Sequence, residues 1–462
     1  MPDYDIQESW KEIQGMVQAR DAARLQAFLD DLSPNEVARA LTRLTDDERR
    51  DLLLLQDPED AADLIEELTD AHAADIIEEL DAEDAAPIME EMESDHRADV
   101  LGEMPRGDAE AILKEMAPEE AQDARKLLQY DDDMAGGIMV TEFVSYPQDA
   151  TVAGVIQDLR EHHEAYADYG IHYVYVYSER GTLIGVVRMR DLLLAPSGKF
   201  LSEIMIANPI YVTVDESLSA LDDFFERYPF WNVPVTNNAG KMIGVVRRAD
   251  LEEAIGEAHE KTLMRFGGII GGEEIRSMPL KERTSRRMLW LTVNIIPSLM
   301  AASVIILFEG TIKGIPALVF FIPVIGNMCG CSGNQAVAVS IRELTLGLIQ
   351  PHDVRRVWGK EISVGVLNGL VIGSILGVVA FLVSYFVYEP PMPMLGLVVG
   401  VAFFLNTLVS VTLGGLIPLA LRRMELDPAL GAPLLMTTLT DMCGLVLIFL
   451  FAQSAMTMGW LG

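Results

Sequence analysis

Asp441 is the residue with the clearest chemical meaning, because it is a carboxylate inside the long apolar run 433–451. That run contains no second acid and no base. A charge at membrane depth costs about 2.5 kcal/mol or more, and it generally faces an aqueous or ionic pathway. Oxygen ligands suit Mg²⁺, which keeps several of its waters and can be bound through them. One acid is too few for a dry site, whereas two copies across a dimer axis would balance one divalent cation.

A second polar stretch lies in an earlier apolar segment, between Pro323 and Gln335, and contains two Gly-Asn pairs, the second ending at Asn334. Such groups are costly in lipid unless they face protein or water. Glycine carbonyls and amide oxygens are hard ligands for a cation, and close helix packing through small residues is the alternative interpretation. Cys329 and Cys331 lie two residues apart and do not share a helix face, which favours buried thiols over a soft-metal site.

The C-terminal half holds five apolar segments, each long enough to cross about 30 Å of hydrocarbon. They are placed at 288–308, 315–341, 361–388, 394–421 and 429–456. Lys and Arg gather before the first, between the second and third, and after the fourth segment. The positive-inside rule therefore predicts a multi-pass protein of the cell (inner) membrane with its N-terminal half cytoplasmic and its C-terminus outside. A helix-packing stripe of glycines recurs in the third segment: Gly365, Gly369, Gly373 and Gly377.

Charge divides the 462 residues into two parts. The first 282 carry 62 acids and 25 bases, a net charge of −37, whereas the remainder carries eight acids and ten bases. So negative a half repels phosphates, which argues against a nucleic-acid partner. It suits cations, although solubility or adaptation to a salty cell would also explain it.

Several other features limit the class of protein. All three cysteines lie in the apolar half, so no disulfide framework is implied. The N-terminus lacks the basic flank and apolar core of a cleaved signal peptide. No nucleophile, glycine-rich phosphate loop or paired catalytic acid indicates an enzyme.

A twelve-residue repeat fills much of the acidic half, within residues 33–128. Each block opens on a capping residue or proline and closes on apolar and acidic pairs. Short helices joined by tight turns are expected to stack into an all-α superhelical domain over residues 1–132. Prolines are expected to interrupt any single long helix: Pro58, Pro87, Pro105 and Pro118.

The pattern then changes to two similar α/β units. Strands are predicted at 174–177, 182–187, 232–235 and 240–246, with helices at 150–162 and 216–228. The segments 185–191 and 244–250 both read Gly-Val-Val-Arg-x-x-Asp. An acidic connecting helix and linker are predicted over 250–282, with the glycine-rich segment 266–272 ending or bending the helix.

The tandem units resemble a pair of CBS modules, at 138–196 and 202–257. That resemblance implies ATP or another adenine nucleotide as a ligand of the pair, with Arg190, Asp191 and Phe230 as its contacts. Arg188 and Arg247 stand where nucleotide-binding modules carry Ser or Thr, which weakens the expectation.

The whole order of domains resembles the MgtE family of magnesium channels and transporters. The matching residues are Pro323, Gly333-Asn334-Gln335, Arg342, Asp427-Pro428-Ala429, Pro433, Thr438, Asp441 and Gly444. The resemblance implies a homodimer in the lipid bilayer, a plug-type connecting helix, and a membrane domain of five transmembrane helices over 283–462. The pore residues that it implies for Mg²⁺ are Asp441, Ala429, Gly444 and Asn334. The regulatory Mg²⁺ residues that it implies on the cytoplasmic side are Asp215, Glu226, Asp250, Glu253, Glu257, Gly136 and Asp427.

Mg²⁺ influx, closed when cytoplasmic Mg²⁺ bridges these domains, is the function that the resemblance implies. An ion-coupled secondary transporter of divalent cations such as Co²⁺ or Mn²⁺ is the first alternative. A nucleotide-sensing membrane receptor is the second, and heavy-metal export through the cysteines is the third.

Overall fold

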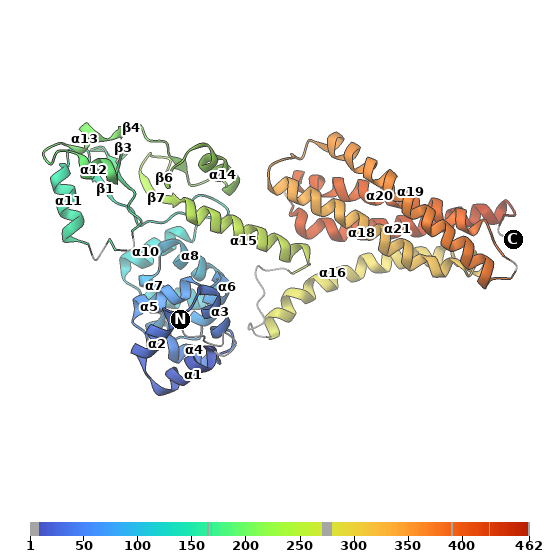
Figure 1. Ribbon diagram of the computed structural model, residues 1–462, viewed down its shortest axis with the longest axis horizontal. Coiled ribbons are helices and arrows are strands. Elements are labelled where there is room, and N and C mark those ends of the chain that lie inside the picture. The colour runs from blue at the N-terminus through green and yellow to red at the C-terminus, as the bar shows by residue number, and fades with distance from the viewer. Residues whose placement is uncertain are drawn as a thin grey trace. The chain divides into compact units, whose positions relative to one another are not determined.

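The structure is a computed structural model that describes residues 9–163, 166–167, 169–269, 280–389, 391–424 and 426–460. The chain forms two compact units. The first unit runs to Glu260, and the second contains residues 261–269 and the helices from Leu280 onward. Figure 1 labels the elements of both.

The first unit begins with ten short helices, called here the helical N-domain. They are α1 (Ser9–Ala19), α2 (Ala22–Leu29), α3 (Pro34–Leu41), α4 (Asp46–Leu53), α5 (Pro58–Glu66), α6 (Asp70–Ile77), α7 (Ala82–Glu91), α8 (Ser94–Glu103), α9 (Arg106–Glu115) and α10 (Pro118–Leu127). From α5 onward each helix packs on the one two places along, α5 on α7, α6 on α8, α7 on α9 and α8 on α10. A continuous core of Ala, Leu, Ile and Met runs through the stack, which confirms the predicted helical domain.

Local sequence sets where these helices begin. Thr45 and Glu48 form a capping box, in which the Glu48 amide donates to Thr45 Oγ1 at 3.4 Å and the Thr45 amide donates to the Glu48 carboxylate at 3.0 Å. The expectation that Pro87 interrupts a helix was wrong, because Pro87 lies inside α7. Its missing N–H removes one hydrogen bond, and the surrounding side chains of α7 are buried in the core of the stack.

Two α/β modules follow in the same unit. The first sheet has the order β1 (Ser145–Pro147), β2 (Tyr173–Tyr177), β3 (Leu183–Arg188) and β4 (Ile206–Ala207), and the second has β5 (Val212–Thr213), β6 (Asn232–Thr236) and β7 (Met242–Arg247). Each sheet begins with a parallel pair and continues with an antiparallel hairpin. The helices are α11 (Val152–Glu161), α12 (Met189–Leu194), α13 (Leu201–Ile204), α14 (Leu218–Arg227) and α15 (Arg248–Phe266). The predicted strands and their order are confirmed.

The segment that leads into the first module pairs with a strand of the second module. Val140 and Val245 exchange both backbone hydrogen bonds at 2.9 Å. The last helix of the second module is also the predicted acidic helix, since α15 runs without a break from Arg248 to Phe266. Gly268, at φ +81°, follows its end, as the glycine-rich segment predicts. The rest of the predicted linker, residues 270–279, lies outside the described residues.

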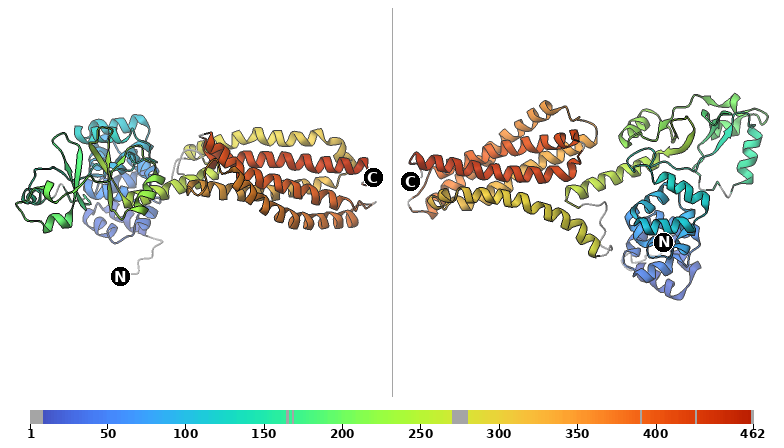
Figure 2. Two further views of the ribbon diagram at one scale, coloured as in Figure 1. Left: turned by 90° about the horizontal axis from the view of Figure 1, so that it is seen from above. Right: turned by 180° about the vertical axis from the view of Figure 1, so that it is seen from behind.

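The second unit is helical: α16 (Leu280–Leu307), α17 (Glu309–Gly314), α18 (Leu318–Thr345), α19 (Val354–Val387), α20 (Leu395–Arg423) and α21 (Pro428–Thr457). Figures 1 and 2 both show α18 to α21 running alongside one another, and α20 packs on α18, α19 and α21. Among the described helices, four are long and apolar enough to cross a membrane: α16, α19, α20 and α21. The remaining predicted span, 315–341, corresponds to α18, which is not among them. Its Asn, Gln and Ser residues lower its hydropathy.

The glycine stripe of α19 packs where expected. A Cβ on Gly373 would lie 2.9 Å from the carbonyl oxygen of Gly400, and a Cβ on Gly377 would lie 2.9 Å from that of Gly396. The two helices therefore touch backbone to backbone.

Candidate metal centres

A cavity of about 420 Å³ surrounds Asp441 in the second unit. Helices α16, α18 and α21 contribute its walls, including Asn327, Asn334, Thr437 and Gly444 beside Asp441. Asp441 lies two turns after Pro433 within α21, and its side chain is half-buried. A water molecule occupies about 30 Å³ in the liquid, so the cavity has room for a cation with bound waters.

Small residues on α18 let the carboxylate approach that helix. A Cβ on Gly326 would lie 3.2 Å from Asp441 Oδ1. Asn334, two turns further along α18, has a buried side-chain oxygen without a hydrogen-bond partner among the described residues. The amide oxygen of Asn334 and the carboxylate of Asp441 line the same cavity, and oxygen donors of this kind suit a hydrated divalent cation.

The structure brings three of the four expected pore residues to this cavity. Asp441, Asn334 and Gly444 line it, but Ala429 does not. Ala429 is buried in the first turn of α21 against Val337 and Met436. Twelve residues of helix put it about 18 Å along the axis from Asp441, so the two residues lie on the same helix but at different positions along its length.

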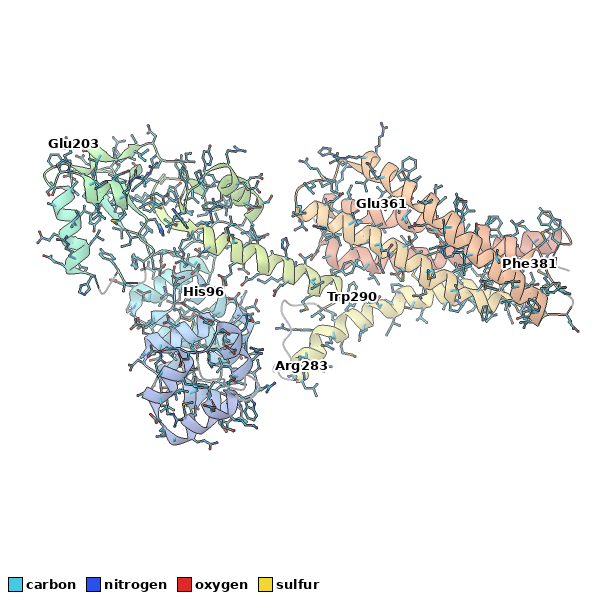
Figure 3. All side chains as sticks on the ribbon, viewed as in Figure 1. His96, Glu203, Arg283, Trp290, Glu361 and Phe381 are labelled. Carbon is cyan, nitrogen blue, oxygen red and sulfur yellow. The ribbon has the colours of Figure 1, made fainter. Side chains whose placement is uncertain are left out.

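The first unit contains a second centre, at the start of α8, which sequence reasoning missed. Glu93, Asp95 and His96 offer ligand atoms that all lie within 4.8 Å of one another. Figure 3 labels His96 on the helical N-domain. Asp95 is 5% exposed, and a buried carboxylate in so acidic a chain is the signal that marks this cluster.

Arg247 joins the cluster to the second module. Its guanidinium donates through two nitrogens to the two carboxylate oxygens of Glu93, and its Nε donates to Asp250 at 2.7 Å. Asp95 lies 3.9 Å from the same guanidinium. One arginine therefore serves three carboxylates, and His96 is the second basic group among them.

Burial shifts the pKa values of the acids in this region. Burial raises the pKa of Asp95 to about 7, with repulsion from Asp250 adding to it. Burial also raises the pKa of Asp99 well above its usual value, and nearby carboxylates, among them Glu257, raise it further. Carboxylates held together at such cost are stabilised by a bound cation.

Three of the regulatory residues implied by the resemblance face this cluster. Asp250 bonds to Arg247, Glu253 acts electrostatically on His96, and Glu257 acts on Asp99. All three lie on one stretch of α15.

In the described part of the chain, no hydrogen bond or ion pair joins the remaining regulatory residues to this cluster. Asp215 and Glu226 are exposed in the second module. Gly136 is buried, and its amide donates to the Val214 carbonyl at 3.0 Å. Asp427 caps α21 in the second unit and pairs with Arg265 at 3.0 Å.

The expected nucleotide contacts Arg190 and Phe230 do not touch one another. Arg190 pairs with its neighbour Asp191 at 3.1 Å, whereas Phe230 stacks on Tyr228 at 5.5 Å between ring centroids. In the described part of the chain, no hydrogen bond, ion pair or ring contact joins Arg190 to Phe230.

Family models match most of the chain. A model described as a divalent cation transporter, MgtE, matches residues 322–451, and the MgtE intracellular N domain matches 32–133. The CBS domain model matches 135–198 and 201–257. With the long apolar helices, these matches define the class as a multi-pass membrane transporter of divalent cations.

Individual relatives agree. The magnesium transporter MgtE of Thermus thermophilus is 30% identical over 341 residues, which cover 73% of this chain and 73% of that one. The chain belongs to the MgtE family of magnesium transporters. A crystal structure of the soluble part of a magnesium transporter is 25% identical with a TM-score of 0.50, and it covers 55% of this chain and 99% of that one. The cytosolic domain of the Mg²⁺ channel MgtE, solved in complex with ATP, is 27% identical with a TM-score of 0.48, covering 53% and 99%.

Proposed function

We propose that this protein is a Mg²⁺-selective channel or transporter that carries Mg²⁺ into the cell past Asp441. The observation that carries the proposal is the position of this carboxylate in a cavity among apolar helices, together with the side chains of Asn327, Asn334 and Thr437. Membership of a magnesium transporter family supports Mg²⁺ as the substrate. Asp441 supplies negative charge. The amides of Asn327 and Asn334 accept hydrogen bonds from the waters that the ion keeps, or donate hydrogen bonds to them.

The proposal includes five transmembrane helices, with α18 as the polar one, and a homodimer. Pro323, Asn327 and Cys331 line the cavity and are exposed in the single chain. A second copy placed against α18 would cover them and would bring a second Asp441 near the first. The positive flanks of the spans support a cytoplasmic first unit in the cell membrane.

Gating by cytoplasmic Mg²⁺ is the second part of the proposal. The donor set around Glu93, Asp95, Asp99, Asp250 and Glu257 fits a cation, because its carboxylates are crowded and only partly neutralised by Arg247. Mg²⁺ would hold the helical N-domain, the second module and α15 in one compact arrangement. Binding at several weak sites shifts the population between two states steeply with concentration.

Adenine nucleotide at the CBS pair stays a lesser proposal. It rests on the family motif that includes Arg190 and Asp191. In the structure these two residues bond to each other. Isothermal titration of ATP into the protein, with Arg190→Ala as the comparison, tests it directly.

Mg²⁺ uptake into proteoliposomes at clamped voltage tests the main proposal. Asp441→Ala is expected to abolish uptake, whereas Glu309→Ala, an exposed acid of the same unit that pairs with Lys313, is expected to leave it unchanged. Uptake that survives Asp441→Ala contradicts the proposed pathway. Flux that requires a proton or sodium gradient favours the secondary transporter. Heavy-metal transport that is lost in Cys329→Ser/Cys331→Ser favours heavy-metal export, and no uptake at all favours the receptor.

A further inference from the structure

His96 differs from the other two residues of the α8 centre, because it offers a nitrogen atom instead of an oxygen atom. Its imidazole and the carboxylates of Glu93 and Asp95 each provide one ligand atom, and these atoms lie within 4.8 Å of one another. Atoms bound to one zinc ion at about 2.0–2.2 Å lie no more than about 4.4 Å apart. The three side chains are therefore close to the spacing that a shared transition-metal ion imposes.

Asp95 has a carboxylate oxygen that can coordinate an ion. Its side chain is almost fully buried, and its Oδ1 accepts a hydrogen bond from the His96 amide at 2.9 Å. Its Oδ2 lies 3.9 Å from the Arg247 guanidinium, which is longer than a hydrogen bond. In the described part of the chain, no hydrogen bond reaches this second oxygen. A buried carboxylate oxygen without a hydrogen bond is costly, and a cation that coordinates it removes the cost.

Arg247 does not exhaust the oxygens of Glu93. Its guanidinium donates one hydrogen bond to each of the two carboxylate oxygens. An ionised carboxylate has about four lone-pair positions, so two of them stay open. Glu93 can therefore bond to Arg247 and coordinate an ion at the same time.

Acids from three helices surround the imidazole of His96. Glu66 of α5 and Glu253 of α15 act on it electrostatically, as do Glu93 and Asp95, and the Glu66 carboxylate accepts a hydrogen bond from the Glu93 amide at 2.6 Å. The carboxylates of this region are those of Glu66, Glu93, Asp95, Asp250 and Glu253, and its basic groups are Arg247 and His96. The acids outnumber the bases, which favours a divalent cation.

The ligand type decides which divalent cation such a centre prefers. Mg²⁺ takes oxygen ligands and keeps much of its water, whereas imidazole suits iron, nickel, copper and zinc. For a given set of nitrogen and oxygen ligands, affinity rises from Mn²⁺ through Fe²⁺ and Co²⁺ to Ni²⁺. A centre that contains an imidazole therefore binds these ions at lower concentrations than a centre of carboxylates does, and the bound ion replaces the ring proton.

We infer that Glu93, Asp95 and His96 form a transition-metal site, which closes the transport path at lower cytoplasmic concentrations of Co²⁺ or Ni²⁺ than of Mg²⁺. This inference rests on the proposed gating by cytoplasmic cations. Glu93 also bonds to Arg247 of the second module, so an ion held here stabilises the contact between that module and the helical N-domain. A transition metal that has entered the cell would then stop further entry.

Patch-clamp currents carried by Mg²⁺ test the gating, with Co²⁺ or Mg²⁺ stepped on the cytoplasmic side. Wild-type currents are expected to close at a Co²⁺ concentration about tenfold below that of Mg²⁺. His96→Gln removes the nitrogen ligand and is expected to raise the Co²⁺ concentration for half closure about tenfold. Its amide oxygen still suits Mg²⁺, so the Mg²⁺ value is expected to change less than about twofold. His259→Gln, exposed on α15, is the matched control and should change neither value.

X-ray absorption of one equivalent of Co²⁺ tests the site itself, in the full chain in detergent with excess Mg²⁺. Scattering from a coordinated imidazole is expected in the wild type and in His259→Gln, and it should be absent in His96→Gln. Its absence in the wild type overturns the inference, and this result does not depend on a variant folding. Imidazole scattering that persists in His96→Gln also overturns it, because another histidine then holds the ion.

A purely structural His96 gives a different pattern of closure. His96→Gln would then shift the Co²⁺ and Mg²⁺ values by the same factor, whereas Co²⁺ that only blocks the transport path would act equally on the wild type and His96→Gln. Either result overturns the inference while gating by Mg²⁺ stands. If neither cation closes the wild-type currents, the proposed gating fails, and the X-ray absorption still decides whether the metal site exists.

Discussion

Arg247 and Glu93 form a two-point ion pair between the second α/β module and the helical N-domain, joining positions 154 residues apart. Both side chains are largely buried, at 20% and 27% exposed. Burial alone would raise the pKa of Glu93, but the hydrogen bonds and charge of Arg247 reverse the effect and lower it. The guanidinium of Arg247 therefore provides a positive charge at the contact between the two domains. Neighbouring carboxylates remain available to bind a diffusible cation.

Arg247→Met is expected to weaken this docking. Loss of hydrogen bonds to a charged partner costs about 1.5–3 kcal/mol, because Glu93 and Asp250 stay buried. Hydrogen exchange of the α8 amides measures the effect. Arg188→Met, the equivalent but exposed position of the first module, is the control. Equal protection in the two variants would contradict a docking role for the pair.

Neutralising α15 is expected to reduce inhibition by internal Mg²⁺. Asp250→Asn/Glu253→Gln/Glu257→Gln removes three carboxylates that face the α8 cluster, and the Mg²⁺ concentration for half closure should rise about tenfold or more if about 1.4 kcal/mol is lost. Glu252→Gln/Glu260→Gln changes exposed acids of the same helix and should leave gating unchanged. Patch-clamp currents at stepped internal Mg²⁺ decide between these outcomes.

His72 is expected to make the helical N-domain sensitive to acid. Burial and the nearby charge of Arg49 lower its pKa from 6.5 to about 4. Between these values the unfolded chain binds a proton that the folded chain does not, so stability falls as pH drops from 6.5 to 4, by up to about 3 kcal/mol. His72→Gln has no titrating group at this position, so it should not show this fall in stability.

Asp95 and Asp99 give the opposite slope, because their raised pKa values make the folded state bind more protons. These acids are present in both the wild type and His72→Gln, so their effect cancels when the stabilities of the two proteins are subtracted. Hydrogen exchange of α6 amides at pH 7, 5.5 and 4.5 measures that difference. A difference between the two proteins that is independent of pH would argue against a neutral buried histidine.

The sequence was most informative where one residue contradicts its surroundings. Asp441 in an apolar run identifies the cavity without a structure, because the cost of a buried charge is a local property. The α8 cluster has no such signal. Asp95 is one of many acids in its half, and only docking against Arg247 and α15 buries it.

Other errors have physical causes as well. Pro87 was expected to end a helix, but the packing of α7 outweighs one missing hydrogen bond. Ala429 was expected near the ion path; it lies about 18 Å along α21 from Asp441, and its place on that path stays a prediction.

The α19–α20 interface gives a prediction about stability. Gly373→Ala places a methyl group 2.9 Å from the Gly400 carbonyl oxygen, and overpacking of this kind costs about 1–3 kcal/mol. Gly359→Ala on the same helix meets nothing within 4 Å and should be neutral or slightly stabilising. Thermal unfolding in detergent compares the two, and equal melting temperatures would contradict the close approach.

The same interface has a mechanical consequence. Helices that touch through side chains can slide, since rotamers adjust, but α19 and α20 meet through main-chain atoms that have no rotamers to change. Helices α19 and α20 should therefore move together as one rigid unit during transport. Displacement that opens or closes the path would then fall to the helices that line the Asp441 cavity, α16, α18 and α21, moving against a fixed support.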